Sequence, residues 1–406
     1  MIACRKILLP VLLFLCAASF NTYAQQDVLT QHNNISRNGW YDKETILNKT
    51  NVTASTFGRL FTLTVDDQLY AQPLVKLNLP IPGKGTKNVV FAATVNNTVY
   101  AFDADSADLP PPYWSVNLTA AGCRAVNKAD MTGACGGFYN DFSGNIGIVG
   151  TPVIDTATNT IYMVARSVNA TNNTYYQYLH ALDITTGAEK PGSPVFITAT
   201  VTGNGDGSSG GKVVFDQQHQ NQRGGLLLLN GIIYIAWSSH CDWPPYHGWI
   251  MGYDKSTLQQ KYVYCSTPDG YNGGIWMSGG GPSADENGNI YAGVGNGSVG
   301  YNGNPADLTN RSESALKLTP DLKISSFFTP RNFETLEGAD LDFGVTQVML
   351  IPNTNRAIVG VKDGHLYLLN RDAMGGYNAN GDQNVQTIDL GSNAFLRSAI
   401  CSIACP

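Results

Sequence analysis

Short apolar runs recur along the chain between clusters of Gly, Asn, Asp and Pro. Five of these runs are rich in Val, Ile and Tyr, as β-strands are: Asn88 to Ala92, Thr160 to Ala165, Gly231 to Trp237, Asn289 to Val294 and Arg356 to Val361. Each run contains an apolar reference position, its anchor residue: Val90, Ile161, Ile233, Ile290 and Ile358. Successive anchors are 71, 72, 57 and 68 residues apart. Because similar segments at similar spacing indicate a repeat, the pattern predicts five sheet units with loop insertions.

Each run is followed by a second strand-like phrase. These phrases are Val99 to Asp103, Leu179 to Asp183, Ile250 to Asp254, Ala315 to Leu318 and His365 to Leu369. An aspartate at the end of a strand can hold the next turn through its side-chain oxygen. No helical periodicity interrupts the series. The sequence therefore predicts an all-β fold, a β-propeller of four-stranded blades, because a ring of sheets buries both faces of every blade.

The C-terminal end departs from this pattern. Only five repeats are visible, and the chain stops at Ser398 to Pro406. We expect a propeller domain over residues 25–390, an irregular tail over 391–406, and at least one missing blade. A truncated gene, a frame-shifted tail or a ring completed by a strand around Leu60 to Val65 would each explain this. A missing blade would expose sheet edges, which leaves the oligomeric state open.

The first 24 residues have the three parts of a secretory signal peptide. Arg5 and Lys6 precede an apolar run from Ile7 to Ala18, and Thr22-Tyr23-Ala24 forms a small-residue cleavage site. We predict cleavage after Ala24 and a secreted or periplasmic mature protein with no stable membrane span. A permanent anchor is the alternative, which the short run and its proline disfavour.

Composition narrows the function classes. Charged residues make up 14% of the chain, against roughly 25% in an average soluble protein. The formal net charge is −6, and like charges form no blocks. Because binding to a nucleic-acid backbone requires clustered positive charge, nucleic acid is excluded as a partner.

The cysteines agree with export. Six remain after the signal segment: Cys123, Cys135, Cys241, Cys265, Cys401 and Cys405. An even number in an oxidising compartment predicts disulfides. We expect two local bridges, Cys123–Cys135 and Cys241–Cys265, each closing one insertion, and no role for Cys401 and Cys405.

Several phrases resemble one family. Tyr100 to Asp103 and Ala181 to Gly187 look like the blade motif of pyrroloquinoline-quinone-type propellers. Further similar phrases are Gln31 to Gly39, Tyr70 to Leu74, Gly150 to Asp155, Tyr246 to Trp249 and Gly274 to Gly279. The chain from about Gln31 to about Leu390 thus resembles the secreted bacterial quinoprotein-like propellers. The resemblance implies the fold, but many members of the superfamily are scaffolds without a quinone.

The resemblance also implies what an enzyme of this type would need. In quinoprotein dehydrogenases a tryptophan stacks under the quinone, a disulfide between adjacent cysteines covers it, calcium bridges its carboxylate and an aspartate acts as the base. This chain has no adjacent cysteines. Trp276 is the candidate for stacking and Arg223 for a further cofactor contact, whereas no calcium ligands can be assigned. The alternative is that Trp276 only packs within a blade.

The densest polar segment runs from Ser238 to Trp249. It contains His240, Asp242 and His247 on a loop between strands. Two histidines with a carboxylate between them could bind a metal or transfer protons. The alternative is a disulfide-pinned loop that packs its aromatic residues over a neighbouring blade, with both histidines in hydrogen bonds to backbone. His32 and Arg37 are likewise either groups facing the axis or structural donors.

Two functions follow. The first is an exported propeller that binds a small molecule, a glycan or another secreted protein. The second is an oxidoreductase of the alcohol or sugar dehydrogenase type, which uses pyrroloquinoline quinone with calcium at the mouth of the ring. An enzyme requires residues from different blades to meet at one end of the axis, so the two hypotheses differ in whether His240, Asp242, His247, Trp276 and Arg223 converge.

Overall fold

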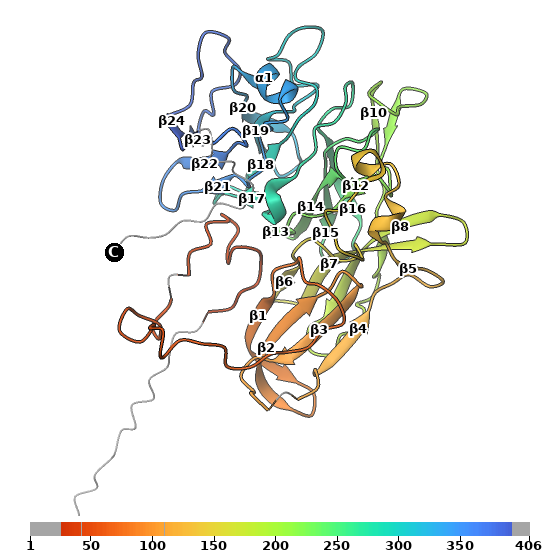
Figure 1. The fold of residues 1–406 in the computed structure, drawn as a ribbon, viewed down its shortest axis with the longest axis vertical. Coiled ribbons are helices and arrows are strands. Elements are labelled where there is room, and N and C mark those ends of the chain that lie inside the picture. Colours follow the sequence, from red (N-terminus) through yellow and green to blue (C-terminus); the bar gives the residue numbers. More distant parts are fainter. Residues whose placement is uncertain (1–25, 42, 109, 392–406) are drawn as a thin grey trace, which may run out of the picture. The chain divides into compact units, whose positions relative to one another are not determined.

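The computed structural model describes residues 26–41, 43–108 and 110–391, and its strands form antiparallel sheets that follow one another in chain order (Figure 1). The predicted signal segment, Cys401 and Cys405 lie outside the described residues. The chain divides into two compact units. One comprises 1–26 and 42–58, and the other comprises 27–41 and 59–406. In the first unit, the described residues 43–58 form turns in which the Glu44 carboxylate accepts backbone N–H groups.

The second unit contains five sheets of four or five strands among its described residues. The first sheet consists of β1 (Leu74–Ile81), β2 (Gly85–Ala93), β3 (Thr98–Asp103) and β4 (Trp114–Asn117). The second consists of β5 (Arg124–Ala125), β6 (Val153–Asp155), β7 (Thr160–Asn169), β8 (Thr174–Asp183) and β9 (Val195–Phe196). The third consists of β12 (Gln220–Asn221), β13 (Leu227–Leu229), β14 (Ile232–Ser239), β15 (Trp249–Asp254) and β16 (Gln260–Cys265).

The last two sheets have four strands each. The fourth consists of β17 (Ser283–Ala284), β18 (Ile290–Val294), β19 (Ser314–Leu318) and β20 (Ile324–Phe328). The fifth consists of β21 (Met349–Leu350), β22 (Arg356–Gly360), β23 (His365–Asn370) and β24 (Gln386–Asp389). A separate hairpin pairs β10 (Thr200–Thr202) with β11 (Lys212–Val214).

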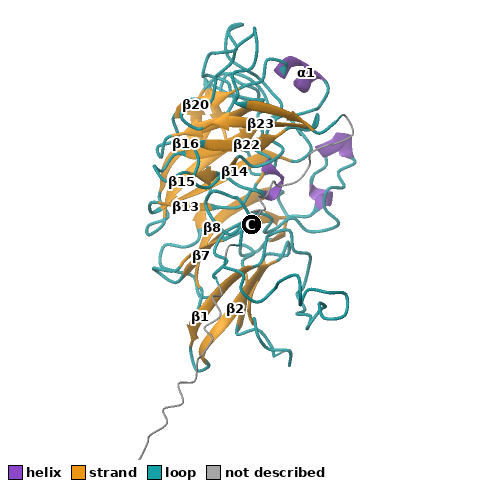
Figure 2. Ribbon diagram, turned by 90° about the vertical axis from the view of Figure 1, so that its left-hand side faces the viewer, coloured by secondary structure: helices purple, strands orange, loops and turns teal. Residues whose placement is uncertain are grey.

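Among the described residues, helical structure is confined to short segments between strands (Figure 2). These are α1 (Phe333–Gly338) and the 3₁₀ turns η1 (Lys128–Asp130), η2 (Ala134–Gly137) and η3 (Met277–Gly279). Within the described ranges, no helix is long and apolar enough to span a membrane.

The predicted repeat is confirmed. The five anchor runs are β2, β7, β14, β18 and β22, one in each sheet, and the five following phrases are the strands that pair with them. The aspartate corners are confirmed as well. The Asp183 carboxylate accepts the N–H of Thr185, and that of Asp254 accepts the N–H groups of Ser256 and Thr257. These corners turn the chain from one strand to the next.

Neighbouring sheets share apolar cores. One buried cluster joins the first and second sheets, a second joins the second and third, a third joins the third and fourth, and a fourth joins the fourth and fifth. At the first of these interfaces the Trp114 indole donates to the Ile184 carbonyl at 3.0 Å and covers Gly187. A Cβ on Gly187 would lie 2.6 Å from the indole ring, which explains the glycine after this corner.

The segment 27–41 crosses the first strands of the sheets. Its backbone bonds to β1 at Val75, to β6 at Ile154, to β17 at Ala284 and to β21 at Leu350. Arg37, which is fully buried, donates to the carbonyls of Gln31, Leu226 and Pro282. Burial without a carboxylate partner lowers the pKa of Arg37 to about 9. Arg37 is therefore the structural donor of the two alternatives, and it ties the segment to the third and fourth sheets.

Candidate functional site

A cavity of about 560 Å³ lies where loops from successive sheets meet. Its lining comprises Asp141, Arg223, Cys241, Asp242, Trp276, Ser278, Asp340, Asp342, Val345 and Lys362. Cavities of roughly 300–1,000 Å³ are the usual size for small-molecule sites. Three of the five residues singled out from the sequence, namely Arg223, Asp242 and Trp276, therefore meet here. Their chemical roles stay predictions.

Trp276 is seated by two glycines. A Cβ on Gly274 would lie 2.6 Å from the indole nitrogen, and a Cβ on Gly295 would lie 2.9 Å from Cδ1. The N–H of Gly295 donates to the carbonyl of Gly274 at 2.9 Å, which holds the two turns together. The glycine-rich phrases around these positions thus give room for a half-buried indole at the cavity wall.

Arg223 lies over the Trp276 ring, with its guanidinium carbon 5.9 Å from the ring centroid. Burial lowers the pKa of this guanidinium, and charges from Tyr139 and Asp141 oppose the shift. No residue that the structure describes forms a hydrogen bond or ion pair with it. An arginine without a partner carries five donors and a full charge, so it is suited to bind an anionic group.

Most of the other charged side chains that line the cavity have hydrogen-bond or ion-pair partners. Lys362 lies 2.6 Å from an Asp342 oxygen and 3.0 Å from an Asp340 oxygen. Tyr246 donates to Asp242 at 2.5 Å. Burial raises the pKa of Asp342 to about 6, although Lys362 acts to lower it. Asp342 thus changes charge near neutral pH, whereas Arg223 stays positive.

His240 lies behind the cavity wall and is fully buried. Its Nε2 is 2.6 Å from an Arg166 nitrogen, and its Nδ1 is 2.7 Å from the Tyr139 hydroxyl. Because a guanidinium can only donate, Nε2 must accept, and the proton sits on Nδ1. Burial and the charge of Arg166 hold the pKa of His240 well below its usual value. Neither ring nitrogen is left for a metal.

His247 is also structural in its contacts. Its Nε2 donates to the Asp206 carbonyl at 2.9 Å, and its Nδ1 lies 2.8 Å from the Thr267 hydroxyl. Burial lowers the pKa of this imidazole. His247 thus contacts backbone, as the alternative for this loop expects, whereas His240 contacts the side chains of Arg166 and Tyr139. Across the described ranges, no three His, Cys, Asp or Glu residues are placed to hold a metal ion.

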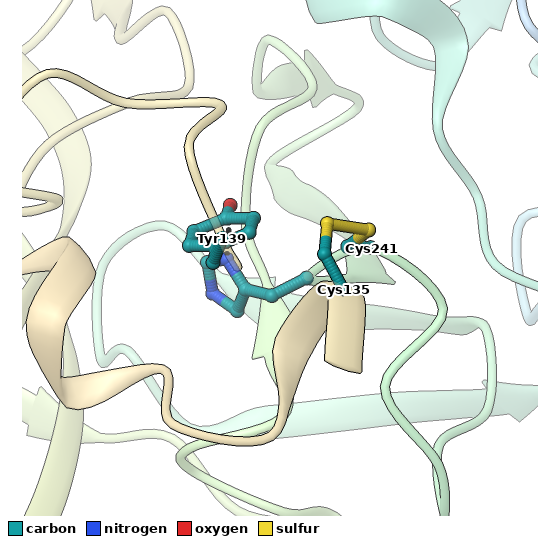
Figure 3. Close-up of a disulfide and its surroundings, with 4 residues drawn as sticks. Cys135, Tyr139 and Cys241 are labelled. Atoms are coloured by element: carbon teal, nitrogen blue, oxygen red, sulfur yellow. Dashed lines mark hydrogen bonds between the residues drawn. A yellow bond between two sulfur atoms is a disulfide. The ribbon is translucent and has the colours of Figure 1, made fainter. Parts of the chain in front are cut away.

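The predicted disulfide pairing is wrong. Cys135 pairs with Cys241, beside Tyr139 (Figure 3), whereas Cys123 and Cys265 are free thiols. In the third sheet, Trp237 of β14 pairs with Trp249 of β15, which pairs with Cys265 of β16. Cys265 therefore lies two strands away from the end of β14, which Cys241 follows. Two strand spacings are about 9.6 Å, which exceeds the Cα separation a disulfide can bridge.

The observed bridge joins insertions from two sheets. The excursion around η1 and η2 has its own small core, which includes Met131, Tyr139 and Phe142. Trp243 packs against this core and stacks on His219, with ring centroids 4.1 Å apart. The disulfide therefore pins the excursion to the loop that carries Asp242. It also fits the oxidising compartment expected for the protein.

The cavity wall contains strained backbone. Cys241, Asp242, Ser278 and Asp340 have φ values of 52°, 48°, 45° and 53°. Residues other than glycine adopt this left-handed region rarely, at a cost of about 1–3 kcal/mol each, and such residues gather at functional sites. Their presence in one cavity supports a role for it.

Sequence reasoning missed Asp340, Asp342 and Lys362. The pattern that could have revealed the first two is positional: Trp276 and Asp342 each lie in the connection before the first strand of a sheet, and Arg223 lies in the connection between β12 and β13. Because these connections all reach the same end of the repeat, polar residues within them meet. A comparison of equivalent connections, rather than of compact motifs, would have found the set.

Comparisons with known proteins support the fold. No family model matches the chain, and no curated protein matches it. Among solved structures, it is similar to a quinohemoprotein alcohol dehydrogenase from Pseudomonas putida HK5 (TM-score 0.58, 15% identity, 90% of this chain and 48% of that one). It is also similar to the enzyme of that name from Comamonas testosteroni (TM-score 0.56, 15% identity, 91% and 52%). A europium-containing methanol dehydrogenase gives a TM-score of 0.56 at 16% identity, covering 90% and 58%.

The described chain thus has a quinoprotein-like β-propeller fold. It spans about half the length of the dehydrogenases it resembles. At this identity the likeness concerns the fold, and the site must be judged on its own residues.

Pyrroloquinoline quinone with calcium is the group that this fold suggests. The face of Trp276 and the charge of Arg223 fit a planar anion. The residues do not fit the calcium ion that accompanies the quinone, because no three acidic residues in the described part of the chain are placed around one point. Adjacent cysteines are also absent, and the disulfide at the wall joins residues 106 positions apart. No quinone chemistry is therefore assigned to these residues.

Proposed function

We propose that this protein is an exported propeller that binds a small planar ligand in the Arg223–Trp276 cavity, with an anionic group at one end of the ligand. The observation that carries the proposal is Arg223, a charged side chain on the face of an indole without a partner among the described residues. Arg223 is only partly buried and lines the cavity, so an anion there would gain a charge-assisted hydrogen bond to its guanidinium.

The rest of the cavity determines the other end of the ligand. Asp242, Asp340 and Asp342 lie on the wall as hydrogen-bond acceptors, and Lys362 is paired with the last two. Carboxylates repel a second anionic group and accept hydrogen bonds from hydroxyl or amino groups. The ligand class is therefore an aromatic or heterocyclic carboxylate with donor groups at its far end.

The test is calorimetric titration of the mature protein with aminonaphthoate and with its neutral amide. We expect saturable binding of the acid, with the amide at least roughly tenfold weaker, because a charge-assisted bond is lost. Arg223→Gln should remove the preference for the acid. Arg331→Gln, which changes an exposed arginine away from the cavity, is the matched control. Equal binding of acid and amide by the parent protein would refute the proposal.

The oxidoreductase alternative is favoured by the fold and by the stacking face of Trp276. It is tested in parallel by adding pyrroloquinoline quinone with and without calcium and measuring reduction of an artificial electron acceptor with alcohols and aldoses. Calcium-dependent dye reduction would establish the alternative. Binding of the quinone without dye reduction would leave the protein as a binding propeller.

A further inference from the structure

A second cavity, of about 370 Å³, lies beside α1 and away from the Arg223–Trp276 cavity. It is bounded by the turn at Tyr271, the turn from Gly297 to Val299, and the α1 residues Phe333, Glu334 and Glu337. None of its lining residues is shared with the first cavity.

Two aromatic side chains and two carboxylates define its chemistry. The Tyr271 side chain is 46% exposed, and Phe333 is held edge-on by Tyr377, with ring centroids 5.5 Å apart at 80°. Glu337 accepts the N–H of Gly297, and its hydrogen bond to Tyr271 contributes to a raised pKa of that phenol, after burial as the main cause. Phe333, Tyr271 and Glu337 are therefore positioned before any ligand binds.

The charged residues that line the second cavity are all acidic. Glu334 and Glu337 line it, and no Lys, Arg or His is among the lining residues within the described ranges. Cations are attracted both by carboxylates and by the negative faces of aromatic rings. A metal ion would need several oxygen ligands around one point, which no acidic group of the described chain provides. A neutral ligand could donate hydrogen bonds to the two carboxylates, but only a cation also gains from their charge.

We propose that this second cavity binds an organic cation, a quaternary ammonium or alkylammonium group, between Tyr271 and Phe333. The two glutamates supply the countercharge, and the aromatic rings supply the contact with the methyl or methylene groups. The site is independent of the Arg223–Trp276 cavity and selects ligands of the opposite charge.

The test is calorimetric titration of the mature protein with choline, tetramethylammonium and dimethylbutanol, the neutral isostere of choline. We expect saturable binding of both cations, with the isostere roughly tenfold weaker or absent, and weaker cation binding at high salt. Tyr271→Ala and Glu334→Gln should each lower choline affinity about tenfold. Tyr301→Ala, which changes a tyrosine 42% exposed and outside the cavity, should have no effect.

Glu334 is exposed and forms no part of the core, so its variant keeps the fold, and unchanged thermal unfolding would verify this. Equal binding of choline and its isostere would overturn the proposal, as would choline binding that Tyr271→Ala leaves intact. Binding of a neutral saccharide in preference to the cations would overturn it as well. Loss of aminonaphthoate binding in Arg223→Gln, with choline binding retained, would show that the two cavities bind their ligands independently.

Discussion

At the scale of single residues, the arginines of the protein differ in whether their side chains have hydrogen-bond partners. Arg37 and Arg166 are fully buried and donate to backbone carbonyls and to His240, whereas Arg223 is only partly buried. Arg223 lies over the Trp276 ring, and the charge of Asp141 acts on it without an ion pair between the two described residues. The difference separates two structural arginines from one that is suited to a ligand.

Asp342 makes ligand binding depend on pH. Its folded pKa of about 6 lies above the value of 3.8 for a free aspartate, so it is protonated and neutral below that pH. An anionic ligand then meets less negative charge. We expect the affinity for aminonaphthoate to rise about threefold to tenfold between roughly pH 7 and pH 5. Titrations across this range would measure it.

Asp342→Asn mimics the neutral carboxyl, so its affinity at neutral pH should equal that of the parent protein at low pH and should stay flat. Asp321→Asn, at an exposed aspartate outside the cavity, is the control. A pH slope that persists in Asp342→Asn would assign the titration to another group.

His240 is predicted to be structural. His240→Ala would leave the buried Arg166 and Tyr139 groups without their imidazole partner. We expect the free energy of unfolding to fall by about 3–5 kcal/mol, measured by denaturant titration. If zinc raised the melting temperature of the parent protein and not of the variant, His240 would instead be a metal ligand.

At the scale of elements, the contact between Trp114 and Gly187 joins the first two sheets. Gly187→Ala places a methyl group 2.6 Å from the indole at a φ of +75°. Gly231 is a matched control, since its φ is +82° and nothing lies within 4 Å of the added Cβ. We expect Gly231→Ala to cost about 1–2 kcal/mol of unfolding free energy from the backbone alone, and Gly187→Ala to cost about 1–3 kcal/mol more. Equal losses in the two variants would show that the sheets can separate without cost.

The Cys135–Cys241 disulfide positions the cavity wall. Replacing both cysteines by serine should lower the free energy of unfolding by about 2–4 kcal/mol, because a long loop is released in the unfolded chain. It should also weaken aminonaphthoate binding, since Cys241 and Asp242 share the wall. Thermal unfolding and calorimetry would measure both effects. Cys123→Ser, at a free thiol, should change neither. Unchanged aminonaphthoate binding in the double variant would show that the disulfide is not needed to position the cavity wall.

At the scale of the whole molecule, the repeat was predictable because every sheet has the same local pattern in the sequence: an apolar strand followed by a second strand. In three of the five sheets this second strand ends in an aspartate, namely Asp103, Asp183 and Asp254. These are local features with a local cause. The all-β class and the five sheets follow from them.

The site was predictable only in part. Trp276 and Asp242 stood out because they lie in unusual phrases, but Asp342 and Lys362 lie in ordinary loops that meet only in the folded chain. The same cause defeated the disulfide pairing. Cys135 and Cys241 are 106 residues apart in sequence, and sequence proximity favoured the wrong partners.

We propose that a planar anion stacks on Trp276 beside Arg223. The most direct measurement is a fluorescence titration of the mature protein with aminonaphthoate, compared with Trp276→Phe. The account predicts saturable tryptophan quenching in the parent protein and its loss in the variant, although the other five tryptophans remain. The same quenching in Trp276→Phe, or none in the folded parent protein, would contradict it.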